Sequence, residues 1–174
     1  MSEIESQAVI SVVASRIAEE AVPDEVDLAP AMALAFIRGG QDREELFRKE
    51  QGSQVGGFGS GGFAAIFPII LKALSQHALS VYKFLTTDAV NLIGLLNNLL
   101  DLPSKLKREE TIKALPKDAY EPLTTVINVI SYELEASGLS PEQADLITFR
   151  VVRSLLNSPR DSVVFIESIK RKKL

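Results

Sequence analysis

Apolar residues recur every three or four positions along most of the chain, which is the spacing of one face of an α-helix. In the first such stretch Val9, Val13, Ile17 and Ala21 follow this spacing, with Ile10 and Val12 widening the stripe, before Pro23 ends the helix. The same pattern restarts after polar or helix-breaking residues along the rest of the sequence. The predicted helices begin near Ser2, Asp27, Asp42, Pro68, Ala89, Pro122, Ser140 and Ser158.

Helix start and stop signals support this pattern at several positions. Ser2 and Glu5 form a capping-box pair, in which each side chain accepts a hydrogen bond from the other residue's free backbone N–H. The run Ser140-Pro141-Glu142-Gln143 places a cap, a proline and an acid at the start of a helix, after a left-handed exit at Gly138. Such short connections predict antiparallel packing of neighbouring helices.

The alternative to helix is a strand at two β-branched runs, Ile10–Val13 and Val126–Ile130. Both runs lie inside longer helical patterns, and no hairpin turn joins two alternating stretches. We therefore predict an all-α fold: a multi-helix bundle of seven or eight short helices around a central apolar helical hairpin at about 66–101. Residues 1–174 are expected to form one helical domain, with a glycine-rich hinge at 52–62.

The central hairpin has apolar residues on more than one face. A helix of that kind is either central to a core or covered by a partner, because water does not favour such a surface. We expect a non-catalytic interaction or assembly protein that buries this surface by self-association, as a homo-oligomer, or against a partner protein. The predicted contact surface consists of Ile66, Phe67, Ile70, Leu74, Leu92 and Leu96.

Composition and charge narrow the classes of function. The chain has no cysteine, which excludes disulfides and thiolate chemistry, and its acidic start lacks the basic, then apolar pattern of a secretory signal. We expect a cytoplasmic protein, with a peripheral membrane location as the alternative. The net charge of −4 argues against a general nucleic-acid binder. An adaptor role through a basic segment ranks third among the functions; its residues are Lys105, Lys107, Arg108 and Lys113.

No residue pattern typical of catalysis, cofactor binding or metal binding stands out. The one histidine, His77, lies in an apolar stripe without a neighbouring acid, which favours a core or interface position. Gly57 to Gly62 formally match the glycine spacing of dinucleotide-binding loops, but no predicted strand precedes them. We therefore predict no catalytic, cofactor-binding or metal-binding residue, no enzyme activity and no small-molecule substrate.

The alternative function is a membrane-active protein that inserts into lipid or forms a pore. The glycine-rich stretch leads into Phe63-Ala64-Ala65-Ile66-Phe67, and residues 56–70 resemble in composition the membrane-inserting segments of fusion proteins and pore formers. The uncharged runs of eleven and twelve residues are shorter than the roughly 18–20 residues that span a bilayer. The inserting residues would be Phe58, Phe63, Ile66 and Phe67; otherwise this segment is a loop whose phenylalanines pack on the bundle.

Overall fold

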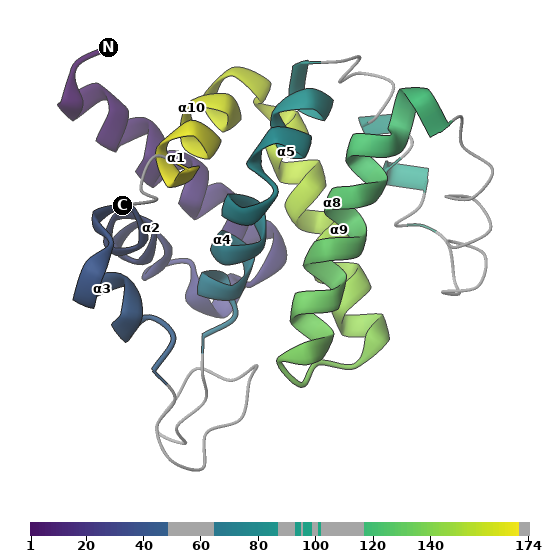
Figure 1. Cartoon of the computed structure of the whole chain (residues 1–174), viewed down its shortest axis with the longest axis horizontal. Helices are drawn as coiled ribbons and strands as arrows, with labels where there is room; N and C mark the ends of the chain where they lie inside the picture. Colours follow the sequence, from purple (N-terminus) through teal and green to yellow (C-terminus); the bar gives the residue numbers. More distant parts are fainter. Residues whose placement is uncertain (49–64, 87–92, 95, 99–100, 102–116, 171–174) are drawn as a thin grey trace.

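The computed structural model describes residues 1–48, 65–86, 93–94, 96–98, 101 and 117–170. Within these ranges the regular structure is helical throughout, which confirms the predicted all-α multi-helix bundle (Figure 1). The helices are α1 (Glu3–Ala21), the 3-10 helix η1 (Pro23–Glu25), α2 (Ala29–Arg38), α3 (Gly40–Glu45), α4 (Phe67–Gln76), α5 (Ala78–Thr86), α8 (Lys117–Ala136), α9 (Pro141–Asn157) and α10 (Pro159–Lys170).

Two predicted caps are confirmed in full. The Ser2 hydroxyl accepts a hydrogen bond from the Glu5 N–H at 3.2 Å, and the Glu5 carboxylate accepts one from the Ser2 N–H at 2.8 Å. Ser140 and Gln143 make the same reciprocal pair at the start of α9. These motifs satisfy backbone donors within four residues, so sequence alone is sufficient to place them.

Other predicted boundaries were wrong. The N-cap of α2 is Leu28, without a side-chain hydrogen bond, and not Asp27. Pro122 lies inside α8, five residues after the helix begins at Lys117. A proline removes only one helical hydrogen bond, and α8 continues through this loss because its apolar face packs on α4, α5 and α9.

The predicted helix from Pro68 to about Leu85 is divided at His77 into α4 and α5. His77 has φ −117° and ψ 29°, outside the helical region, although neither proline nor glycine is near it in sequence. Both short helices pack against α8 and α10. We attribute the break to this packing, because two separate helices can each direct an apolar face to the same two neighbours.

The core is one continuous cluster of buried apolar side chains. Helix α4 lies near its centre and contacts α2, α8 and α10, whereas α1 packs on α2, α9 and α10 (Figure 1). The core-facing stripe of α1 includes Ile10, Val13 and Ile17. Val12 was expected on that stripe, but it lies on the other side of the helix and is 51 % exposed.

Several predicted features lie outside the described residues. These are the glycine-rich hinge at 52–62, most of the hairpin's second arm and the basic segment with Lys105, Lys107, Arg108 and Lys113. Of the second arm, residues 93–94 and 96–98 are described and are helical, and Leu96 is fully buried.

A buried hydroxyl pair joins α8 to α9. Ser131 Oγ donates a hydrogen bond to Thr148 Oγ1 at 3.0 Å, and Thr148 Oγ1 donates to the Ala144 carbonyl at 2.7 Å. We expect Thr148→Val to lower the free energy of unfolding by about 1–2 kcal/mol, because it leaves the Ser131 hydroxyl buried without its acceptor. Chemical denaturation measures this change.

The matched control is the double variant Ser131→Ala with Thr148→Val. Removing both hydroxyls leaves neither group unpaired, so the double variant should recover most of the stability that Thr148→Val loses. A double variant less stable than Thr148→Val alone would show that this pair does not act as a unit.

Candidate functional site

The side chains predicted to form the contact surface lie in the interior of the bundle. Ile66 is 7 % exposed, and Phe67, Ile70, Leu74 and Leu96 are completely buried. Leu92 lies outside the described residues. The reason is the number of neighbours around α4: helices α2, α8 and α10 enclose its apolar faces. In this conformation these five side chains are therefore not available to a partner.

Of the residues predicted to insert into a membrane, two lie outside the described residues and two are buried. Phe58 and Phe63 lie outside the described residues, whereas Ile66 and Phe67 are enclosed at the start of α4. Among the helices that the structure describes, none has the length and hydropathy needed to cross a bilayer. His77 lies half-buried at the break between α4 and α5.

The start of α4 is held by a carboxylate from a distant part of the chain. Glu25 Oε2 accepts a hydrogen bond from the Ile66 N–H at 2.8 Å, and Oε1 accepts one from the Phe67 N–H at 2.9 Å. The N-cap residue, Ile66, has no side-chain acceptor of its own, and Pro68 has no N–H to satisfy. Glu25 therefore caps α4 from η1, across 41 positions of sequence.

Burial has the largest effect on the pKa of the Glu25 carboxyl group. Glu25 is 5 % exposed, and the removal of water raises its pKa above the ordinary value of 4.5. The hydrogen bonds from Phe67 and Ile66 act in the opposite direction, and the negative charge of Asp24 adds to the rise. The net effect is a raised pKa, because the loss of hydration exceeds the gain from the two N–H donors.

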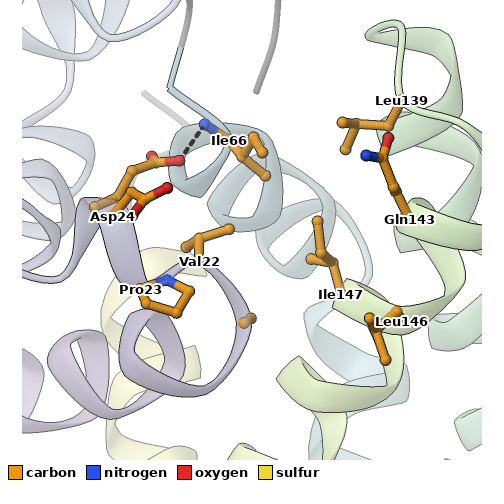
Figure 2. A pocket seen from close by; sticks show the side chains of 10 residues that line it. Val22, Pro23, Asp24, Ile66, Leu139, Gln143, Leu146 and Ile147 are labelled. Atoms are coloured by element: carbon orange, nitrogen blue, oxygen red, sulfur yellow. Dashed lines mark hydrogen bonds between the residues drawn. The ribbon is translucent and has the colours of Figure 1, made fainter. Parts of the chain in front are cut away.

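Beside Glu25 lies a cleft of about 240 Å³ between η1, the start of α4 and the start of α9. Figure 2 shows Ile66 and Asp24 on one side of this cleft, and Leu139 and Gln143 on the other. Its walls are mainly aliphatic. The lining residues are Ala21, Val22, Pro23, Asp24, Glu25, Ile66, Leu139, Gln143, Leu146 and Ile147.

Two of the polar side chains in the cleft are already engaged with backbone. The two carboxylate oxygens of Glu25 accept hydrogen bonds from the Ile66 and Phe67 N–H groups, and Gln143 Oε1 accepts one from the Ser140 N–H at 3.3 Å. Neither group is therefore poised to act as an acid or a base. What the cleft offers a ligand is aliphatic contact, as in a recess for an apolar side chain. In the described ranges, no three histidine or acidic side chains converge as metal ligands.

A second feature of the described surface is the outward side of α1. Ile4 is 81 % exposed and Val12 is 51 % exposed, and the exposed Ala8 lies between them. The N-terminal turns of this helix lie at the edge of the molecule (Figure 1). Large apolar side chains are also exposed elsewhere in the described part of the chain: Leu28, Phe47, Leu79, Tyr82, Tyr132 and Leu146.

Sequence reasoning missed two of these features. The signal for Glu25 was indirect: Ala64-Ala65-Ile66 precede α4 and supply no capping side chain, so the cap had to come from elsewhere. For α1 the signal was that apolar residues occur on both sides of the helix. The prediction assigned all of them to a single stripe.

Comparisons of this chain with family models, curated proteins and solved structures give no match.

Proposed function

We propose that this chain is a non-catalytic helical interaction protein, which assembles by covering exposed apolar surface with itself or with a partner protein. The observation that carries the proposal is the second apolar side of α1. One side of this helix belongs to the core, and the other exposes Ile4, Ala8 and Val12 in succession. Single exposed apolar residues are ordinary on a protein surface, whereas a row of them along one helix is typical of a contact surface.

The location of this surface differs from the one predicted from sequence. The apolar residues of α4 are used inside the chain, so they do not supply a contact surface in this fold. The side chains of the α1 row are exposed without any rearrangement. The cleft at Glu25 adds an aliphatic recess on the described surface, between η1 and α9.

The membrane-active alternative has less support from the described residues. Insertion through Ile66 and Phe67 would require the start of α4 to leave the core and to give up both hydrogen bonds to Glu25. Dye leakage from anionic liposomes tests this alternative, with a variant that carries Asp at Phe63, Ile66 and Phe67 as its comparison. Leakage by the unmodified chain alone would favour insertion over assembly.

The oligomeric state tests the proposed function directly. We expect the weight-average mass from light scattering or sedimentation to rise above the 19.0 kDa of one chain as protein concentration increases. Apolar surface covered by mass action gives this concentration dependence. A mass that stays at one chain over the whole concentration range would overturn the self-association part of the proposal.

A further inference from the structure

The cleft beside Glu25 has an apolar interior with room for about one side chain. Figure 2 shows Val22 and Ile66 on one side of it and Leu139 and Ile147 on the other. Its volume of about 240 Å³ exceeds the roughly 150 Å³ that holds a benzene molecule in an apolar cavity. The cleft can therefore hold one leucine or isoleucine side chain, together with part of the aliphatic stem of a neighbouring lysine.

Negative charge surrounds this apolar interior. Of the three stretches that contain the lining residues, 17–37 has five acids and no base, 131–149 has four acids and no base, and 65–71 is uncharged. The bases next to these stretches do not line the cleft; they are Arg16, Arg38, Lys72 and Arg150. A recess with such a surround attracts a cationic ligand and repels an anionic one.

The carboxylate at the mouth of the cleft is not neutralised within the described part of the chain. Of the acids in these stretches, Glu20 pairs with Arg153 at 3.3 Å and Glu133 pairs with Lys72 at 3.4 Å. Asp24 is exposed, lines the cleft and has no ion-pair partner among the described residues. An ammonium or guanidinium group at the mouth of the cleft can therefore bind the Asp24 carboxylate.

We propose that the cleft binds a segment of a partner protein in which a leucine or isoleucine lies next to a lysine or arginine; this inference rests on the proposed function and names the chemistry of the partner. The aliphatic side chain enters between Ile66 and Ile147, and the basic side chain pairs with Asp24. Glu25 stays bound to the start of α4, because both of its oxygens already accept backbone hydrogen bonds. Apolar contact supplies affinity, and charge selects the partner.

Charge and shape together favour this occupant over others. The acids around the cleft repel an anionic peptide and an anionic lipid surface. A small cation satisfies the charge but leaves the aliphatic walls in contact with water, which is unfavourable. A protein segment that carries an aliphatic and a basic side chain side by side satisfies both features of the cleft.

Titration of the full, isotope-labelled chain with short peptides tests this chemistry. The probe is acetyl-Lys-Lys-Leu-Lys-Lys-amide, and the readout is the NMR shift of the backbone amides of Val22, Glu25 and Ile147. We expect a dissociation constant on the order of 1 mM, because the contact buries little more than one side chain and the peptide loses freedom on binding. Serine in place of the leucine should weaken binding about tenfold, and glutamate in place of all the lysines should abolish it.

A matched pair of charge variants locates the cationic contact. Asp24→Lys should weaken binding of the leucine peptide roughly fivefold or more, because it places a like charge at the mouth of the cleft. Glu44→Lys is the control: it changes the net charge equally, at an exposed position on α3 that does not line the cleft. Its effect should be less than about twofold. Thermal unfolding confirms that both variants keep the fold.

Leu146→Asn tests the aliphatic wall. Leu146 lines the cleft but is 36 % exposed, so its replacement leaves the core intact. The variant should bind the leucine peptide several-fold more weakly and should leave the weaker binding of the serine peptide unchanged, because only the leucine contacts this wall.

The outcomes separate this inference from the proposed function. Shifts of the cleft amides that require both leucine and lysine, and that Asp24→Lys weakens more than Glu44→Lys, support the inference. No shift, equal binding of the serine or the glutamate peptide, or shifts confined to other residues overturn it. Shifts of the same amides when the chain is concentrated without peptide identify a second copy as the occupant and overturn a separate partner. The oligomeric state tests self-association independently: a chain that stays monomeric yet binds the leucine peptide supports partner binding alone, and a chain that does neither overturns self-association together with the cleft contact.

Discussion

Replacement of Phe67 by alanine is expected to lower the free energy of unfolding by about 3–5 kcal/mol, the typical cost of truncating a fully buried phenylalanine. The Phe67 side chain is completely enclosed at the first position of α4, a helix that lies among α2, α8 and α10. Truncation removes apolar contacts and leaves a cavity that the surrounding helices cannot fully close. Urea or guanidinium denaturation measures the change, which corresponds to roughly 6–20 °C in Tm for a chain of this size.

Two control variants test whether the loss of stability in Phe67→Ala comes from the burial of this side chain. Phe67→Leu retains most of the apolar volume and should cost less than half as much. Tyr132→Ala removes an aromatic side chain that is 71 % exposed on α8, and it should change stability by no more than about 0.5 kcal/mol. If Phe67→Ala left stability unchanged and altered only self-association, Phe67 would belong to a contact surface, as the sequence pattern first indicated.

Local signals in the sequence explain which boundaries could be predicted. The capping boxes at Ser2 and Ser140 act over three residues, so the residues that determine them are adjacent in sequence. The left-handed conformation at Gly138, with φ 106°, also follows from its own residue type. The break at His77 has no such signal, because it depends on α8 and α10, which come later in the chain.

The location of apolar surface could not be predicted in the same way. Periodicity identifies apolar positions on α4, but it does not say how many helices will surround them. Among the described helices, α2, α8 and α10 enclose α4, so its second apolar face is buried inside the chain. On α1 the opposite occurs: Val12 follows the apolar pattern, yet its side of the helix lies outside the bundle.

The capping role of Glu25 is the feature that sequence was least able to reveal. Its partners, the N–H groups of Ile66 and Phe67, are 41 and 42 residues away. From sequence, an acid that follows Pro23-Asp24 is typical of an ordinary surface residue at the end of a helix. Only the folded arrangement, in which η1 meets the start of α4 beside the cleft, gives this carboxylate its two donors.

Among the variants proposed for this chain, removal of the Glu25 carboxylate is expected to have the second largest effect on stability, after Phe67→Ala. Glu25→Ala should lower the free energy of unfolding by about 2–3 kcal/mol at neutral pH, because two backbone N–H groups inside the bundle lose their acceptor. The variant also no longer buries a carboxylate charge, and this gain offsets part of the loss in stability. Denaturation with urea measures it, and Asp24→Ala, at the exposed neighbouring position, is the control that should stay within about 0.5 kcal/mol.

The pH dependence of stability tests the raised pKa of Glu25. Between 4.5, the ordinary value, and the higher pKa in the folded state, the folded chain holds a proton that the unfolded chain releases. The contribution of Glu25 to stability is therefore complete below about pH 4.5 and is lost as pH rises through the folded pKa. We expect the free energy of unfolding of the unmodified chain, minus that of Glu25→Gln, to fall over this window and then to become constant.

Glu25→Gln is the suitable reference because it cannot titrate and because the other acids contribute equally to both chains, so that their effects cancel in the difference. Acid should accordingly not release the start of α4: protonation favours the state in which Glu25 is buried. A difference that grows with pH would mean that the N–H bonds from Ile66 and Phe67 outweigh desolvation and that the pKa is lowered. Release of the start of α4 on acidification would then have a physical trigger in this carboxyl group.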